Sequence, residues 1–150
     1  MHIIAPTQKN VKYIHIYGCK ERPHMRRAPE LVRFSLEHHS ALVLAKRISN
    51  AGGRPEALAE VMPDREFLAE LEAHFSAEET RLKREPALLP QLAARLADDH
   101  CSLRALIQQL CAGNLTVLPE FGRCLHAHVR FEERELFPAV ETLIHETGSR

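Results

Sequence analysis

Apolar residues recur every three or four positions through most of the chain after residue 28. The pattern is clear over residues 91–111, which contain Leu92, Leu96, Leu103, Ile107 and Leu110. On a helix with 3.6 residues per turn, these positions share one face. The spacing therefore predicts an amphipathic helix with one buried side.

Proline and glycine divide the chain after residue 28 into four such stretches. Pro29 is a favoured first-turn residue of a helix, and Gly52-Gly53 is typical of a helix end. We expect long helices over residues 29–50, 63–84, 91–111 and 119–144, with a short helical turn after Pro55. Pro138 lies inside the last of these stretches and should kink the helix or end its regular part.

Four long helices joined by short breaks predict an all-α fold, an antiparallel up-down-up-down four-helix bundle with a short N-terminal extension. Few residues are β-branched, and no hairpin dipeptide lies between alternating runs. We expect two parts, a basic arm over residues 1–28 and the bundle over residues 29–150. The arm has six lysine or arginine residues and one acid, Glu21. It either packs on the bundle or binds an acidic partner.

The overall composition excludes several classes of function. Twenty lysine and arginine residues balance twenty aspartate and glutamate residues, so no global field favours nucleic acid or an anionic membrane. No signal peptide or membrane-spanning run is evident, and we expect a cytoplasmic protein. The four cysteines form no C-x-x-C motif, which argues against a disulfide framework or a zinc ribbon.

Histidines and acids form a repeated pattern that indicates a metal site. Residues 74–79 and 128–133 both read H-x-x-x-E-E. In a helix, residues four apart lie one turn apart on the same face. Each copy therefore directs an imidazole and a carboxylate to one place. An acid-histidine unit precedes each copy, Glu37-His38-His39 before the first and Asp98-Asp99-His100 before the second.

The candidate metal ligands are the histidines and acids that this pattern directs inward, namely His38, His74, Glu78, His100, His128 and Glu132. His39 is an alternative to His38. Aligning Glu37-His38 with Asp99-His100 favours His38, whereas matching Leu42 with Leu103 favours His39. We prefer His38.

Four imidazoles and two carboxylates exceed the four ligands of a structural zinc site. They suit two first-row metal ions bridged by carboxylates. Nitrogen and oxygen donors without a thiolate favour iron, followed by manganese, with zinc less favoured.

The last stretch carries a family resemblance. Residues 125–138, with H-x-x-x-E-E followed by Leu136-Phe137-Pro138, resemble the signature of the hemerythrin-like (HHE cation-binding) domains. The two acid-histidine units, with Leu42 and Leu103 after them, are similar to the family's opening motifs. The resemblance covers residues 30–145. It implies a four-helix bundle around two iron ions with an oxo or hydroxo bridge, and it implies that Glu78 and Glu132 bridge the metals.

Two departures from the oxygen-carrying members of that family are evident. Those members have a histidine where this chain has Arg104, and they end in a histidine-aspartate pair at a spacing of five. This chain has His128 and Glu132 at a spacing of four. The resemblance therefore argues against reversible oxygen carriage.

We expect a cytoplasmic non-haem di-iron protein that binds or senses dioxygen, nitric oxide or peroxide, or that handles iron. The alternative is an interaction module that the metal only staples together and whose basic arm binds a partner. Apart from the metal centre, no catalytic machinery is evident. The expected partner is a diatomic molecule or peroxide, with no nucleic acid and no membrane, and the sequence is compatible with a homo-oligomer.

Overall fold

The fold was obtained as a computed structural model, which describes residues 27–148. The helices are α1 (Pro29–Ala51), α2 (Pro55–Val61), α3 (Arg65–Leu82), α4 (Pro90–Cys111), α5 (Leu118–Phe131) and α6 (Phe137–Gly148), with a 3₁₀ turn η1 (Leu115–Val117) and a π-helical segment η2 (Glu132–Leu136). The described residues contain no strand, which confirms the all-α prediction. The predicted arm over residues 1–28 lies outside the described residues, apart from its last two.

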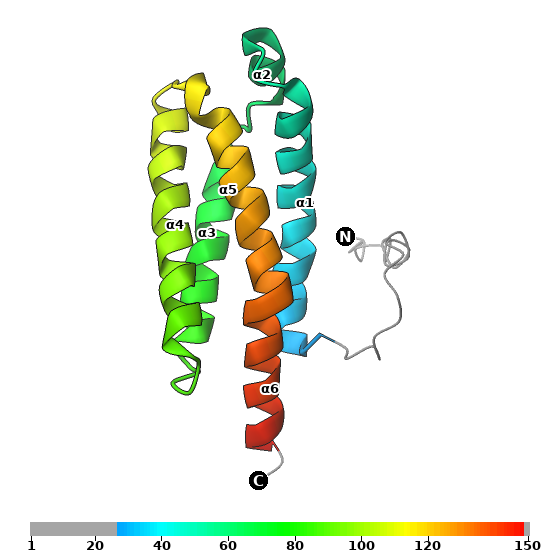
Figure 1. Cartoon of the computed structure of the whole chain (residues 1–150), viewed down its shortest axis with the longest axis vertical. Coiled ribbons are helices and arrows are strands. Elements are labelled where there is room, and N and C mark those ends of the chain that lie inside the picture. Colours follow the sequence, from blue (N-terminus) through cyan, green and yellow to red (C-terminus); the bar gives the residue numbers. More distant parts are fainter. Residues whose placement is uncertain (1–26, 149–150) are drawn as a thin grey trace, which may run out of the picture.

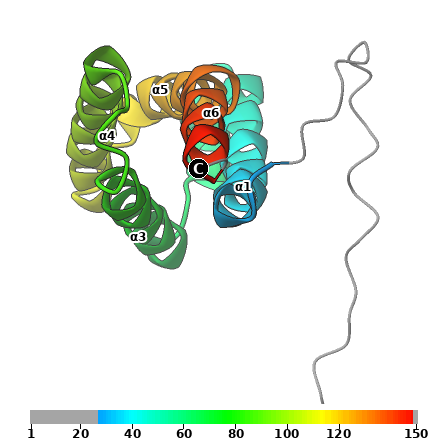
Figure 2. The same cartoon turned by 90° about the horizontal axis from the view of Figure 1, so that it is seen from below.

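The long helices form a closed arrangement. Helix α1 contacts α3 and α5, and α4 contacts the same two helices. Seen along the long axis, the four helices surround a common centre (Figure 2). Helix α2 covers one end, and α6 continues α5 at the other (Figure 1). None of the described helices has both the length and the hydropathy needed to cross a membrane.

The helix ends follow the local signals in the sequence. Proline lies in the first turn of α1, α2, α4 and α5, where its missing N–H is not needed. The carboxylate of Asp64 accepts the Phe67 N–H at 2.8 Å and caps α3. Gly52 ends α1 with a φ of 62°, a conformation that glycine adopts without strain. The four long helices therefore begin and end close to the predicted positions.

Pro138 does not end the last helix. The chain stays helical to Gly148, and the irregularity is the π-helical segment η2. A proline ring clashes with the carbonyl four residues earlier and offers no N–H. In η2 the Phe137 N–H instead bonds to the Glu132 carbonyl, five residues earlier. This wider turn accommodates the proline and keeps the helix intact.

Helix α6 is tied to the start of α1 by a buried acid. The carboxylate of Glu141 accepts the Ala28 N–H at 2.8 Å and a hydrogen bond from Arg27 at 3.2 Å. A carboxylate at a helix N-terminus satisfies a free N–H and favours the helix dipole. The contact fixes the end of the bundle that lies nearest to η2.

Two apolar clusters fill the interior. The cluster near α2 includes Ile48, Phe75, Leu103, Phe121 and Leu125. The cluster near α6 includes Phe34, Leu96, Phe131, Phe137 and Val140. Buried polar residues lie between the two clusters along the helices, as His100 does between Leu96 and Leu103 on α4. The bundle thus has a polar layer between two apolar ones.

Candidate metal centre

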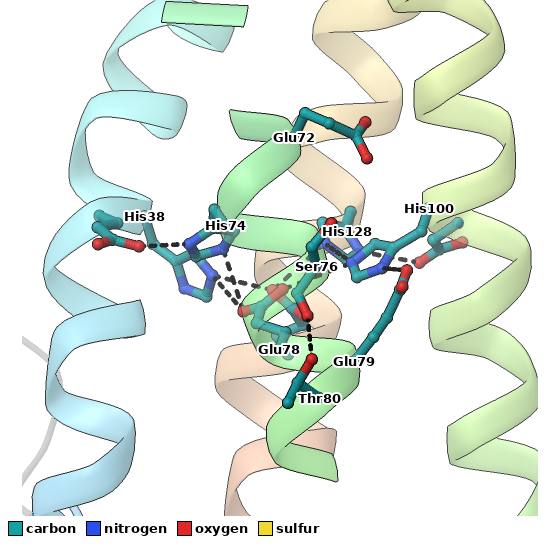
Figure 3. Close-up of polar contacts among 12 residues, drawn as sticks. His38, Glu72, His74, Ser76, Glu78, Glu79, Thr80, His100 and His128 are labelled. Carbon is teal, nitrogen blue, oxygen red and sulfur yellow. Dashed lines mark hydrogen bonds and ion pairs between the residues drawn. The ribbon is translucent and has the colours of Figure 1, made fainter. Parts of the chain in front are cut away.

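The polar layer consists of the six residues that the sequence predicts as ligands. The structure brings them together from every long helix, and Figure 3 labels all of them except Glu132. Each is at most 7 % exposed. They are His38 on α1, His74 and Glu78 on α3, His100 on α4, His128 on α5 and Glu132 at the start of η2.

The two candidates on α1 point in directions about 100° apart around the helix, and only one of them is buried. His38 is 3 % exposed and lies within the layer. His39 is exposed and lines the outer surface between α1 and α5. The structure therefore places His38 in the cluster of donor atoms and leaves His39 outside it.

The imidazole Nε2 atoms converge on the two carboxylates. His38 Nε2 lies 2.9 Å from an oxygen of Glu132 and 3.5 Å from an oxygen of Glu78. His74 Nε2 is 3.1 Å from the same Glu78 oxygen, and His100 Nε2 is 3.5 Å from the other. The two oxygens of Glu78 thus face different sides of the layer.

The donor atoms form two overlapping groups. In each group, one ligand atom from every residue lies within 4.8 Å of the others. Glu78 and Glu132 belong to both groups, joined on one side by His38 and His74 and on the other by His100 and His128. Each group has two imidazoles and two shared carboxylates.

Buried polar atoms that lack a well-formed hydrogen bond indicate that this layer fits cations. Both oxygens of Glu78, both of Glu132 and the Nε2 atom of His38 are buried without a hydrogen bond of acceptable geometry. An unpaired buried polar group costs about 1–3 kcal/mol, and more if it is charged. Metal ions would satisfy these atoms, and mixed imidazole and carboxylate donors are those that first-row divalent ions accept.

A second set of acids contacts the outer nitrogens of the histidines. We call this set the carboxylate ring; it consists of Glu37, Glu79, Asp99 and Glu133. Each acid binds the histidine of a neighbouring helix. The Nδ1 contacts are His38 with Glu133 at 2.7 Å, His74 with Glu37 at 2.7 Å, His100 with Glu79 at 2.8 Å, and His128 with Asp99 at 3.4 Å.

The carboxylate ring surrounds the polar layer because each acid is next in sequence to one candidate ligand but binds the histidine of a different helix. Glu37 precedes His38 on α1 but binds the histidine of α3. When an imidazole is neutral and its carboxylate accepts the Nδ1 proton, the inward Nε2 keeps a lone pair that can bind a metal. The local sequence pattern places candidate metal ligands beside these acids but does not predict which histidine each acid binds.

Arginines hold the carboxylate ring from outside. Arg104 donates to Glu79 and to Glu72, both at 2.7 Å. Burial raises the pKa of Glu79, but hydrogen bonds from Arg104 and His100 outweigh it and lower the pKa below its usual value. Arg104, which stands where oxygen carriers have a histidine, thus supports the ring. Similar contacts join Arg27 to Glu133 and Arg33 to Glu37.

Contacts between the acids and bases of the layer shift their pKa values. Burial lowers the pKa of His38, but its close contacts with Glu132, Glu133 and Glu78 outweigh it and raise the pKa to about 11. Burial and the charge of Glu78 raise the pKa of Glu132 well above its usual value. Burial also raises the pKa of Glu78, but its contacts with the imidazoles of His100, His38 and His74 outweigh it and lower the pKa well below its usual value.

Aromatic side chains from the apolar clusters fix two of the imidazoles. The ring of Phe75 stacks on His100 with centroids 4.3 Å apart, and Phe137 stacks on His38 at 5.5 Å. These two histidines, His38 and His100, are therefore each held by a stacked ring and by a carboxylate. Such support keeps ligands in one orientation before a metal binds.

A cavity of about 320 Å³ adjoins the layer. His38, His74 and His128 contribute to its lining. The remaining wall combines apolar side chains from three helices, namely Ala41, Phe67, Leu71, Leu125 and Val129, with the polar residues Arg33, Glu37, Ser40 and Glu70. A small molecule could therefore occupy space directly beside the candidate ligands.

The family model of the hemerythrin HHE cation binding domain matches residues 31–140. The chain belongs to the hemerythrin family. This confirms the family resemblance and assigns cation binding to the hemerythrin domain that contains the layer. No curated protein and no solved structure matches the chain at a significant level.

The carboxylate ring predicts that an acid outside the ligand set controls metal affinity. Replacing Glu133 with Gln keeps a hydrogen-bond acceptor for His38 but removes the charge. We expect Glu133→Gln to weaken ferrous ion binding by about tenfold or more, measured anaerobically against a coloured chelator. Glu135→Gln, an exposed change in the same segment, should have little effect. Equal affinities of the two variants would contradict this role.

The raised pKa of His38 predicts that metal displaces a proton. With a pKa of about 11, the imidazole is protonated at neutral pH in the metal-free protein, whereas a ligand must be neutral. Metal affinity should therefore rise with pH from about 6 to about 8. Loading in weak buffer with an indicator dye should show proton release. His39→Ala should leave this release unchanged, and pH-independent binding without any release would disprove it.

Proposed function

We propose that this hemerythrin-family protein is a non-haem di-iron protein that binds or senses dioxygen, nitric oxide or peroxide. The observation that carries the proposal is the sharing of Glu78 and Glu132 between the two donor groups. Glu78 directs one oxygen to His38 and His74 and the other to His100, which suits two ions held side by side. A single ion would leave half of the imidazoles without a role.

The donor chemistry supports iron. Four imidazoles, two carboxylates and no thiolate favour iron, with manganese and zinc less favoured. The alternating direction of α1, α3, α4 and α5 in Figure 1 supports the antiparallel bundle that such a centre needs. A cytoplasmic location stays a prediction.

The arrangement leaves room for a small ligand. Two imidazoles and two shared carboxylates do not complete a six-coordinate ion, and the cavity beside His38, His74 and His128 has largely apolar walls. Two iron ions would supply electron transfer and open positions for a small molecule. The chain itself would exclude bulk water and orient the imidazoles.

Reversible oxygen carriage is not part of the proposal. In the oxygen carriers, a fifth histidine stands at the position of Arg104. Here Arg104 is held by Glu72 and Glu79 at 2.7 Å each, and a guanidinium does not ligate iron at neutral pH. Sensing or reaction with a diatomic molecule or peroxide fits this ligand set better.

Because Glu78 and Glu132 are shared by the two donor groups, substitutions at different ligands should remove different numbers of iron ions. Wild-type protein reconstituted anaerobically should bind about two iron ions per chain. His100→Ala should leave about one, because His38 and His74 still serve the other group. Glu78→Ala should lose most of both, whereas Glu70→Ala, an exposed change on α3, should lose neither. Equal losses from His100→Ala and Glu78→Ala would contradict the shared centre.

Ligand binding separates the proposal from a purely structural metal. Adding nitric oxide or azide to the iron-loaded protein should change its near-ultraviolet and visible spectrum, and zinc-loaded protein should show no change. A full iron content with no response to nitric oxide, azide or peroxide would contradict the proposal. It would favour the alternative in which the metal staples a module whose arm, over residues 1–28, binds a partner.

A further inference from the structure

The outer side of α1 and α5 carries a second feature, which we call the basic groove. It has a volume of about 940 Å³ and lies away from the metal centre. Its basic residues are His39, Lys46 and Arg47 on α1, and Arg123, His126 and Arg130 on α5. No aspartate or glutamate contributes to its lining.

Most of the charge in the basic groove is unpaired. Arg123 forms an ion pair with Glu120 on the same helix. Lys46, Arg47 and Arg130 form none with any described residue. The chain as a whole has no net charge, so the groove is a local concentration of positive charge. Such a surface attracts acidic ligands and repels basic ones.

The floor of the basic groove is apolar because α1 and α5 approach closely. A Cβ atom on Gly122 would lie 2.9 Å from Cγ2 of Ile48, so only glycine permits this packing without a shift. Ala45 also contributes a small side chain, and Val43 is 46 % exposed at the rim. A small apolar floor between cations matches the apolar and acidic sides of an amphipathic segment.

The length of the basic groove distinguishes a polypeptide from a small anion. Its lining extends from His39 along α1 to the turn after its end, Gly52 and Gly53, and from Pro119 to Arg130 along α5. At 1.5 Å per residue, the α1 side is about 20 Å long. This length exceeds a phosphate or carboxylate group and suits a helix of about fourteen residues.

We propose that the basic groove binds an acidic amphipathic helix of a partner protein. Glutamate or aspartate side chains of that helix pair with Lys46, Arg47 and Arg130, and its apolar side covers the floor. The inward faces of the same two helices carry His38 and His128, so the partner binds to the backs of two metal-centre helices. The proposal does not depend on which metal is bound.

The test uses the full chain and a labelled fourteen-residue helical peptide of glutamate and leucine, with fluorescence anisotropy as the readout. Reversing two exposed charges with Lys46→Glu and Arg47→Glu should weaken binding by about tenfold or more. Lys83→Glu with Arg84→Glu reverses an equally exposed lysine-arginine pair outside the groove. That control should change affinity by less than about twofold. The basic segment of residues 1–28 is the same in every variant, so a difference in affinity between the groove and control variants reports on the groove.

Additional variants and ligands distinguish an acidic helix from other ligands of the basic groove and control for misfolding. The milder Lys46→Gln with Arg47→Gln should also weaken binding, and circular dichroism checks that each variant keeps its helices. A peptide with glutamine in place of glutamate should not bind. Equal losses in the groove and control variants would overturn the proposal, as would failure of the acidic peptide to bind at about 1 mM. Tighter binding of duplex DNA or anionic vesicles, lost in the groove variant, would also overturn it.

Discussion

Two carboxylates buried at the centre of the bundle determine how the rest of the site is built. Glu78 is 1 % exposed and Glu132 is fully buried, and neither accepts a hydrogen bond of acceptable geometry. Burying a carboxylate is unfavourable unless the groups around it compensate its charge. Around it the structure alternates in charge outward, from carboxylates to imidazoles, then to the carboxylate ring and its arginines. Each of these successive shells of side chains offsets the charge of the shell inside it.

The helices deliver this arrangement because of where their apolar residues lie. Apolar clusters above and below the polar layer fix the helices, and Phe75 and Phe137 stack on two of the imidazoles. The π-helical segment begins at Glu132, where the chain must present a carboxylate inward and also accommodate Pro138. Segments of this kind often occur at functional sites. The residues that fix the fold therefore also position the side chains of the site.

Much of this could be predicted from the sequence, because helical spacing is local. The positions of His74 and Glu78, one turn apart, are enough to place both on one face. Other features depend on which helices are neighbours. The contact of Glu37 with His74 and the capping of α1 by Glu141 join residues 37 and 113 positions apart, and no local pattern encodes them. The π-helical segment was also missed, since Pro138 alone predicts only a kink or an end.

The most direct test of a shared two-metal centre is a crystal structure of the iron-loaded protein with anomalous diffraction at the iron edge. Two anomalous peaks should appear in the polar layer, one beside His38 and His74 and the other beside His100 and His128. Glu78 and Glu132 should contact both. A single peak at full iron content, or peaks on the surface with the layer unoccupied, would contradict the account.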